Sequence, residues 1–415
     1  MEYQILRNYW GKTKKEVLNF PSNWSVEPCL MGGYNLSPLR PLDIKYSILN
    51  PIGTSNLKKM AKGKKNAVII FDDISRPTRI NKIAPFIIKE LTEGGLEAKD
   101  ISFICALGAH GAHGAQEFRK KLGNKIIGKY KVYNHNPFIN CDHLGKTSLG
   151  TDVEINRELM EADLKIGIGS MLPHPIVGFS GGGKVYFPGV ASIESIKQNH
   201  HAITKHVSSE VVFWQEKNNI FKCDIDEAVS FMNIDFTINA LVNGQGQIIA
   251  LFSGNYKIYN DLAVKKAKKI YHTKQIEKKR VVILNAFLKS NEAFSAILLG
   301  TINLRKKGGV IILITDSPPG QVVHYLTGSF GRHNKGPLNF KQKAPQNLLK
   351  IIIVSPYIFR ADEDWFVEPA EGIVWVNKFP LAIKEAEKTF SGGNIDAALF
   401  PNATIQYYPD VKVSL

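Results

Sequence analysis

Cysteine is scarce in this sequence: the 415 residues contain four, which lie far apart and form no CxxC pair (Cys29, Cys105, Cys141 and Cys223). A disulfide framework and a cysteine zinc site are therefore disfavoured, and we expect a cytoplasmic, reducing location. Long apolar runs are missing too. Stretches such as Val310–Ile314 have the length of strands, well below the roughly 20 residues of a membrane span. The N-terminus lacks a signal pattern, so we expect neither export nor a membrane partner.

Acidic residues are in the minority, with 37 Asp and Glu against 53 Lys and Arg, which gives a formal net charge of +16. The lysines are scattered and match no recognition motif, so we expect no nucleic acid partner. The excess charge is expected on solvated faces and in a positive cleft for small anions. Charged residues make up 22% and apolar residues 44% of the chain, a balance that excludes disordered and fibrous classes.

Short apolar runs alternate with helical stretches, which predicts a parallel sheet covered on both faces. In the first half the predicted strands are Ala67–Phe71, Ile101–Leu107 and Lys165–Ile168, followed by a hairpin over Asp235–Val242 and Gln247–Leu251. The pattern restarts later, with predicted strands at Arg280–Leu284, Val310–Thr315, Lys350–Val354 and Ala397–Phe400, and a helix near Asn291–Arg305.

These patterns predict two α/β domains with mostly parallel sheets and a cleft between them that holds the active site. We expect an N-terminal α/β domain over residues 1–271, which carries the cofactor and catalytic motifs. A basic linker at 272–279 and a C-terminal α/β domain at 280–415 follow. The C-terminal domain is expected to close the cleft, and its last residues to pack back on the first domain.

The most unusual segment is Leu172–His201, in which His174, a glycine run (Gly181, Gly182, Gly183), Lys184 and His200 follow one another. Three glycines let a backbone approach a ligand closely, and a lysine after such a run meets a phosphate or acts as a nucleophilic amine. The segment is not a Walker loop, because Val185 stands where Ser or Thr is needed. The alternative is a plain turn.

Two more segments follow predicted strands. The stretch FDDISRPTR contains Asp72, Asp73 and Arg76; it suits binding of an anion, sugar or metal, and its alternative is an ordinary helix start. The stretch ALGAHGAHG contains His110 and His113, which suit proton transfer or metal ligation unless they are surface histidines in a turn. Three strand ends thus direct Arg76, His110 and His174 to one crevice. Two histidines acting on opposite faces of one carbon suit racemisation, and no GxGxxG fingerprint of a dehydrogenase is present.

These residues carry a resemblance to a known family. Over about residues 65–205 the chain resembles the nickel-pincer-nucleotide enzymes of the lactate racemase family. The matching motifs are Asp72/Asp73 with Arg76-Pro77, LGxH at Leu107–His110, PHxxxGxSGGxK at Pro173–Lys184, and PGxAxxxxxxxNH at Pro188–His200.

The resemblance implies a cofactor, the nickel complex of pyridinium-3,5-bisthiocarboxylic acid mononucleotide, joined covalently to Lys184. It implies His200 as the protein ligand of nickel, beside two sulfurs and a ring carbon. His110 and His174 would be the acid/base pair, and Arg76 would hold the substrate carboxylate. Asp73 would help hold the site or the cofactor ribose, and Gly181, Gly182 and Gly183 would cradle the phosphate.

The function implied is racemisation or epimerisation of a 2-hydroxy acid by hydride transfer to the cofactor and back, with cofactor-synthesis proteins as loading partners. The sequence departs from the family at Gly111, where an arginine is usual, and at Phe294 and Ile297, where a polar pair is expected. Lactate is therefore not the expected substrate, and Lys289, Ser290 or Trp365 are candidate replacement contacts. The alternatives are other redox or elimination chemistry with the same cofactor, or a non-enzymatic protein that binds a small anion or nucleotide.

Overall fold

The computed structural model describes residues 1–206, 210–214, 219–328, 331, 344–390, 392–409 and 411–414. The chain forms two compact units. Unit 1 contains Met1–Tyr34, Tyr271–Val323 and Thr327–Tyr408, and unit 2 contains Asn35–Ile270, His324–Leu326 and Pro409–Leu415.

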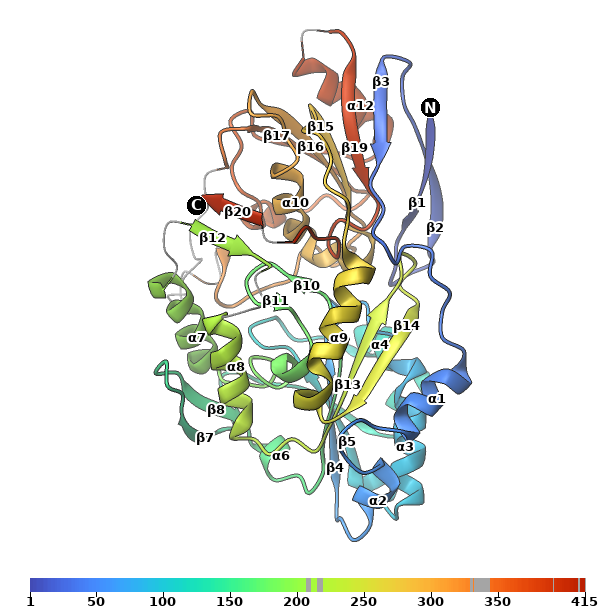
Figure 1. Ribbon diagram of the computed structural model, residues 1–415, viewed down its shortest axis with the longest axis vertical. Coiled ribbons are helices and arrows are strands. Elements are labelled where there is room, and N and C mark those ends of the chain that lie inside the picture. Colours follow the sequence, from blue (N-terminus) through green and yellow to red (C-terminus); the bar gives the residue numbers. More distant parts are fainter. Residues whose placement is uncertain are drawn as a thin grey trace. The chain divides into compact units, whose positions relative to one another are not determined.

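Unit 2 is built on a six-stranded sheet with the order β14-β13-β9-β4-β5-β6 (Figure 1). Its strands are β4 (Ala67–Asp72), β5 (Ile101–Ala106), β6 (Lys131–Asn134), β9 (Lys165–Ser170), β13 (Phe236–Val242) and β14 (Ile248–Gly254). Neighbouring strands run parallel except β13 and β14, which form the antiparallel hairpin that the sequence predicts. The carboxyl ends of β9, β4 and β5 therefore lie side by side.

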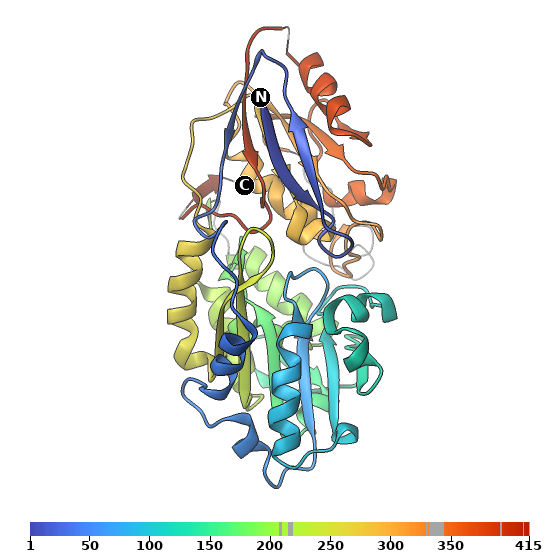
Figure 2. The same cartoon turned by 90° about the vertical axis from the view of Figure 1, so that its right-hand side faces the viewer.

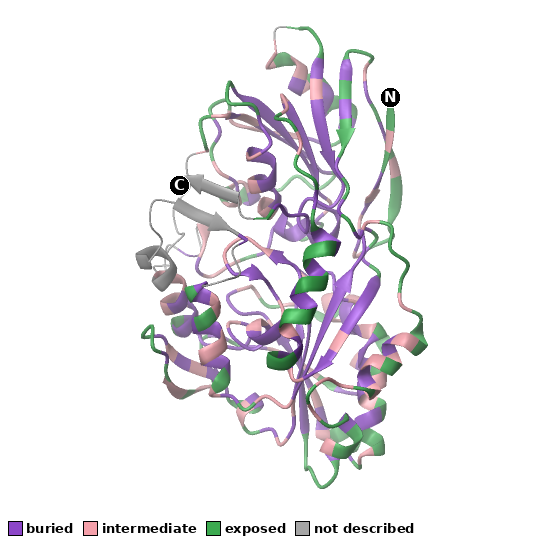
Figure 3. Cartoon of the chain, in the orientation of Figure 1, coloured by how far each residue is buried: buried purple, intermediate pink, exposed green. Residues whose placement is uncertain are grey.

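One face of this sheet is covered by α1 (Pro41–Leu49), α2 (Leu57–Ala61), α3 (Ala84–Glu93), α4 (Ala115–Leu122) and α5 (Asn124–Ile127). Figure 2 shows α3, in light blue, running along the strands. Strand side chains alternate between faces, so Ile69 and Phe71 of β4 point into this core while Val68 and Ile70 do not. Val68 and Ile70 are buried as well, on the other face of the sheet, and the sheet appears as a continuous buried layer in Figure 3. The apolar pattern of the strands follows from this burial on both faces.

The opposite face of the same sheet receives the glycine-rich segment and α9 (Tyr256–Tyr271). The hydroxyl of buried Tyr186 bonds Thr237 Oγ1 at 3.0 Å, and the hydroxyl of Tyr259 donates to Asn239 Oδ1 at 2.9 Å. Gly167 makes this contact possible, because a Cβ there would lie 2.3 Å from the Tyr186 oxygen. The glycine in β9 therefore lets the glycine-rich segment lie directly on the sheet.

Unit 1 contains a second six-stranded sheet, all parallel, with the order β18-β17-β16-β15-β19-β3. Its strands are β15 (Val281–Asn285), β16 (Gly309–Ile314), β17 (Leu348–Val354), β18 (Ile373–Val376), β19 (Ile395–Phe400) and β3 (Trp24–Pro28), with α12 (Phe379–Lys388) against them. The prediction of an α/β protein with mostly parallel sheets is confirmed.

The N-terminal segment differs from the predicted boundary. We expected residues 1–271 to form one domain, but β3 pairs in parallel with β19, and the β1 (Glu2–Arg7) and β2 (Lys14–Asn19) hairpin packs on the same core. Met1–Tyr34 therefore belongs to unit 1. At the other end of the chain, β20 (Val411–Ser414) pairs antiparallel with β12 (Glu210–Phe213) in unit 2.

The segment after β15 also differs from its prediction. Instead of a helix over Asn291–Arg305, an irregular 3₁₀ stretch covers Phe287–Ala296 and a short helix, α10, covers Ile297–Thr301. Lys289 and Glu292 have non-helical backbone angles, which place both side chains in the interior. Within the described ranges, no helix has the length and apolar character needed to cross a membrane.

Further elements lie between these strands, and most of them are short, apart from the helices α7 and α8. They are β7 (Cys141–Lys146) and β8 (Asp152–Asn156), which form a hairpin, α6 (Arg157–Met160), β10 (Pro173–His174), β11 (Gly178–Phe179), the 3₁₀ turn Gly182–Val185, α7 (Ile193–His206) and α8 (Ile220–Ser230).

Candidate active site

The predicted catalytic residues all belong to unit 2 and follow the carboxyl ends of neighbouring strands. Asp73 and Arg76 come directly after β4, His110 lies four residues after β5, and His174 lies four residues after β9. Parallel strands present their carboxyl ends at one sheet edge, so the fold itself assembles these side chains there.

Asp73 and His110 form a buried dyad. The Asp73 carboxylate is 3% exposed and lies 2.7 Å from His110 Nδ1, while its other oxygen accepts hydrogen bonds from the Ser75 amide and hydroxyl. Burial opposes ionisation of this carboxyl group, but the charge and hydrogen bond of His110, with His113 and Arg76, outweigh it. The pKa of Asp73 is therefore held well below its usual value. Since a carboxylate only accepts, His110 Nδ1 donates, so the lone pair of the neutral His110 ring is on Nε2.

This geometry gives Asp73 a clearer task than the one expected of it. Asp73 contacts His110 Nδ1 and so orients that ring; the expectation that it helps hold the site or the cofactor ribose stays a prediction. Its neighbour Asp72 has a structural role, because it accepts from Lys121 Nζ at 2.6 Å, Thr78 Oγ1 at 2.5 Å and the Ser170 amide at 3.0 Å. Lys121 is 1% exposed, and this buried pair joins α4 to the end of β4.

His113 lies in the same group but is oriented differently. Its Nε2 accepts from the Ile74 amide at 3.3 Å and lies 3.8 Å from the Asp73 carboxylate. Loss of hydration lowers the pKa of His113, and the Asp73 charge opposes this only in part. The neutral ring thus holds the loop that carries Asp73.

His174 has the opposite proton arrangement from His110. Its Nδ1 lies 3.2 Å from the Ile176 amide and 3.4 Å from the Val177 amide, both of which donate to it. The ring proton of neutral His174 is therefore on Nε2, which is a donor. In these tautomers His110 can accept a proton at Nε2 and His174 can donate one from Nε2. Such a pair suits a reaction in which one group removes the proton of a hydroxyl and the other returns a proton to the same oxygen.

The glycine run forms a tight cradle before Lys184. Gly181 and Gly182 have φ angles of +96° and +56°, which side chains rarely adopt. A Cβ at Gly183 would lie 2.9 Å from a Val229 methyl, so this backbone has no room for one.

Polar atoms beside this cradle have unused hydrogen-bonding capacity. The Gly182 amide donates to Asn239 Oδ1 at 2.9 Å, and the buried Asn239 Nδ2 and Tyr256 hydroxyl make no hydrogen bond within the structure. A Cβ at Gly183 would lie 3.1 Å from that hydroxyl, which places it against the run. Glycine backbone, lysine and neutral donors together suit a phosphate-bearing group.

His200, the predicted nickel ligand, lies on α7. Its Nδ1 donates to the Ile196 carbonyl at 2.8 Å, which leaves the Nε2 lone pair for a metal. Loss of hydration and the nearby Lys184 charge lower the pKa of His200 to about 4, so the ring is neutral at physiological pH. Among the residues that the structure describes, no three His, Cys, Asp or Glu side chains gather to hold a metal.

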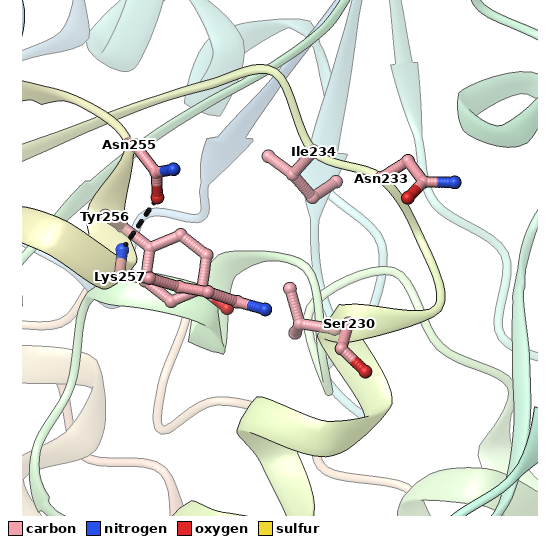
Figure 4. Close-up of a pocket in the computed structure, with 7 residues that line it drawn as sticks. Ser230, Asn233, Ile234, Asn255, Tyr256 and Lys257 are labelled. Carbon is pink, nitrogen blue, oxygen red and sulfur yellow. Dashed lines mark hydrogen bonds between the residues drawn. The ribbon is translucent and has the colours of Figure 1, made fainter. Parts of the chain in front are cut away.

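A polar pocket lies between the end of α8 and the start of α9 (Figure 4), and two of its lining residues, Val229 and Tyr256, also lie against Gly183. Asn255 Oδ1 accepts from the Lys257 amide at 3.1 Å beside Ser230 and Asn233. None of the predicted site residues lines it. A second, smaller pocket is lined by the glycine run, Lys184, Lys222 and Asp226.

The candidate residues of unit 1 are mostly engaged with one another. Phe294 stacks on Trp365, with ring centroids 4.4 Å apart and an interplanar angle of 21°, and Ile297 is buried. Lys289 pairs with Glu292 at 2.6 Å, both less than 10% exposed, and the Ser290 carbonyl accepts from Thr315 and Gln321. Lys289 is therefore neutralised within its own segment.

Sequence reasoning missed several of these contacts. The pairing of Lys289 with Glu292 could not be read from helical spacing, because both residues have non-helical backbone angles. Lys121 sits in a run of basic residues on α4, and Asn239 in an apolar strand, so no local pattern marks either side chain. His324, which lies beside His110, is 214 positions further along the chain.

Fold and site together define an α/β protein in which two histidines and a lysine that follows a glycine run come after the carboxyl ends of neighbouring parallel strands. Residues 11–211 match the model of the lactate racemase N-terminal domain. This part of the chain, just under half of it, is therefore similar to the N-terminal domain of lactate racemases.

Two lactate racemases are similar to it. The one from Thermoanaerobacterium thermosaccharolyticum is 30% identical over 228 residues, which is 54% of this chain and 53% of that protein. The one from Lactiplantibacillus plantarum is 27% identical over 285 residues, 67% of this chain and 66% of that protein. The matched part thus spans about half the length of the first relative and just under two thirds of the second.

Solved structures share the fold over nearly the whole chain. The lactate racemase apoprotein from T. thermosaccharolyticum superposes with a TM-score of 0.73 and 22% identity, covering 99% of this chain and all of that one. A Thermotoga maritima protein gives a TM-score of 0.65 and 19% identity, over 91% of this chain and all of that one. At these identities the likeness establishes the fold alone.

Proposed function

We propose that this protein is a racemase or epimerase of a 2-hydroxy acid. The observation that carries the proposal is the complementary state of two imidazoles: His110 presents a base at Nε2, and His174 presents a proton at Nε2. One imidazole removes the hydroxyl proton from one enantiomer of the substrate, and the other imidazole returns a proton to the oxygen when the opposite enantiomer forms. The match to the lactate racemase N-terminal domain and the similarity to two lactate racemases support this reaction class.

The residues around the glycine run fit the nickel-pincer nucleotide implied by the family. Lys184 follows a cradle in which a Cβ at Gly183 would clash, and two buried polar groups beside it are unsatisfied. Lys184 would attach the cofactor, Gly181–Gly183 would lie against its phosphate, and His200 Nε2 would ligate its nickel. When bound, the cofactor supplies an acceptor that takes the hydride from the reacting carbon and gives it back.

The chain's own residues then do the following. Arg76 binds the substrate carboxylate; its guanidinium is set by hydrogen bonds to the Ser75 hydroxyl at 2.7 Å and carbonyl at 3.3 Å. Asp73 keeps His110 in the tautomer that accepts the hydroxyl proton at Nε2. His174 gives its Nε2 proton to the carbonyl oxygen of the planar 2-keto acid. In the reverse direction the two imidazoles exchange roles.

The substrate we propose is a 2-hydroxy acid other than lactate, although both relatives are named lactate racemases. The segment expected to supply a polar pair carries Phe294, stacked on Trp365, and buried Ile297. Apolar residues there would favour substrate side chains other than those that a polar pair binds. One added or missing group in such a pocket changes the relative transition-state binding of two substrates by about 1–3 kcal/mol.

Two alternatives differ in reaction class. Other redox or elimination chemistry would use the same residues on a different hydroxy acid. A non-enzymatic binding protein would have no need of the His110 and His174 proton arrangement, which favours the enzyme. We further propose a cytoplasmic enzyme that is loaded by cofactor-synthesis proteins.

The test is a panel of single-enantiomer 2-hydroxy acids incubated with cofactor-loaded protein and followed by chiral chromatography. Inversion of at least one acid, with lactate a poor substrate, supports the proposal. Net formation of a keto acid or an alkene instead of inversion would favour the first alternative.

The cofactor assignment is tested separately by two variants. Lys184→Ala is expected to lose the covalent adduct, measured by intact mass, while its circular dichroism spectrum stays that of wild type. His200→Ala is expected to keep the adduct but lose nickel, measured by elemental analysis. An unchanged adduct mass in the first variant, or full nickel occupancy in the second, would overturn the respective assignment.

A further inference from the structure

A buried carboxylate contacts the helix that carries His200. Asp224 belongs to α8 and is 1% exposed. Its Oδ2 accepts hydrogen bonds from Asn199 Nδ2 at 2.6 Å and from Thr151 Oγ1 at 2.9 Å, and its Oδ1 accepts from Thr147 Oγ1 at 2.5 Å. One side chain thus joins α7, α8 and the turn between β7 and β8, which lie side by side in Figure 1.

The three donors around Asp224 are themselves buried, neutral side chains. The Thr147 oxygen accepts from the Thr151 amide at 3.1 Å, so its own proton is the one donated to Asp224. A carboxylate held in the interior by neutral donors is costlier to bury than an apolar side chain of similar size. This cost favours a role in geometry over a role in stability alone.

The Asn199 contact fixes α7 directly beside His200. Successive residues of an α-helix are rotated by about 100°, so holding Asn199 against α8 sets the direction in which His200 leaves the helix. One turn earlier, the Ser195 hydroxyl accepts from the Glu154 amide at 2.9 Å, which holds the same face of α7 to β8. The His200 ring is then oriented by its hydrogen bond from Nδ1 to the Ile196 carbonyl at 2.8 Å. Two contacts of the helix and one of the ring thus determine where Nε2 lies.

We propose that Asp224 is a positioning residue for the nickel ligand: through Asn199 it holds α7 so that His200 Nε2 stays in one place. This inference rests on the proposed function, in which His200 binds the nickel of the cofactor. Asp224 itself touches neither metal nor substrate in this account. Disturbing its contact with Asn199 is expected to loosen the metal without removing the adduct, because Lys184 lies in a different segment, the turn Gly182–Val185.

The experiment measures how fast a chelator removes nickel from cofactor-loaded protein, by elemental analysis, while intact mass confirms the adduct on Lys184. Asn199→Asp sets two carboxylates against each other. It is expected to lose nickel about 10-fold faster than wild type, the lower end of the range for groups that orient a metal ligand. Adding Asp224→Asn exchanges carboxylate and amide across the same contact, and this double variant is expected to return toward the wild-type rate.

Thr151→Val is the matched control, because Thr151 donates to the same carboxylate oxygen as Asn199 but lies on the turn and not on α7. Its urea midpoint is expected to fall, and its nickel is expected to leave at the wild-type rate. Equally fast nickel loss in Thr151→Val and Asn199→Asp would mean that general stability decides the outcome and would overturn the inference. So would a double variant that loses nickel as fast as Asn199→Asp alone.

A measurement on cofactor-free protein separates this inference from the proposed function. Nitrogen-15 NMR of the histidine rings reports which ring nitrogen carries the proton, and comparison with His200→Ala identifies the His200 signals. Wild type and Thr151→Val are expected to show the Nδ1–H tautomer that the hydrogen bond to Ile196 fixes, and Asn199→Asp a mixture of both tautomers.

That NMR result supports the positioning of His200 by Asp224 even if His200→Ala keeps its nickel, a finding that would count against the proposed function. An unchanged tautomer in Asn199→Asp overturns the inference even if His200 proves to be the nickel ligand.

Discussion

Asp73 is the residue on which the proposed proton transfer depends most. It combines near-complete burial with a 2.7 Å contact to His110 and two hydrogen bonds from Ser75. Its role resembles that of the carboxylate in a catalytic triad, which fixes the tautomer of a histidine and stabilises its protonated form.

We predict that Asp73→Asn lowers racemase turnover about 100-fold or more, because an amide does not hold His110 in one tautomer. The free energy of unfolding at pH 7 should fall by about 1–3 kcal/mol, the range for a buried hydrogen bond left imperfect. The folded-state pKa of Asp73 is lowered from 3.8, so its stabilising effect is present above about pH 4 and is lost as the pH falls below that value. The stability difference between variant and wild type should shrink accordingly.

Ser75→Ala is the control for this substitution. It removes the Ser75 hydroxyl, and with it one hydrogen bond to the same carboxylate and one from Arg76, but it leaves the charge of Asp73 and the His110 contact in place. We expect it to raise the KM through Arg76 and to lower kcat much less than Asp73→Asn does. Equal losses in the two variants, in paired denaturation and kinetic measurements, would mean that Asp73 acts through loop structure alone.

At the scale of elements, the glycine-rich segment depends on the sheet beneath it. We predict that Gly167→Ala destabilises the protein by about 1–3 kcal/mol, the usual cost of overpacking, because the new Cβ would lie 2.3 Å from the fully buried Tyr186 hydroxyl. Gly169→Ala is the control on the same strand and face, since its Cβ would come no closer than 3.7 Å to any neighbouring atom. Equal urea midpoints for the two variants would contradict this account of the contact.

A second prediction concerns the start of α7, the helix that carries His200. His135 donates from Nε2 to the Ala191 carbonyl at 2.8 Å, and loss of hydration lowers its pKa to about 4 from a usual 6.5. Between these two pH values the unfolded chain binds a proton at His135 and the folded chain does not. The free energy of unfolding should therefore fall as the pH is lowered through this window, by at most about 1.4 kcal/mol per pH unit from this group.

His135→Gln keeps a donor for the Ala191 carbonyl but does not titrate. Its stability should depend less steeply on pH than that of wild type over the same window, with the contributions of His113 and His200 still present. Denaturant titrations at several pH values measure the two slopes. Identical slopes would mean that His135 is not the buried neutral group inferred from the structure.

At the scale of the whole molecule, the N-terminal segment is part of the C-terminal unit. Removing residues 1–34 would take β3 from the edge of the sheet and expose β19. We predict that this truncation lowers the melting temperature of unit 1 and promotes association through the exposed edge. Calorimetry and light scattering test this, and an unchanged melting profile would contradict the observed sheet order.

The sequence predicted most of the sheet strands because buried parallel strands read as unbroken apolar runs. It did not predict β3, because Trp24–Pro28 has only five residues, ends in proline and pairs with a strand about 370 positions away. The site residues, too, were predictable where the signal is local in the sequence. Residues at strand ends, such as Arg76 and His174, were predictable from local motifs. The Asp73–His110 dyad and the His324 contact were not, because they depend on which loops the tertiary fold brings together.

The central claim is that His110 and His174 both exchange protons with one 2-hydroxy acid, each of them serving one of its two enantiomers. It is tested most directly by following the enantiomeric excess of a pure 2-hydroxy acid with cofactor-loaded wild type, His110→Asn and His174→Asn. The account predicts decay to a racemic or epimeric mixture with wild type and loss of this decay in both variants. Full racemisation by either variant, or none by a wild-type protein that carries the adduct on Lys184, would contradict it.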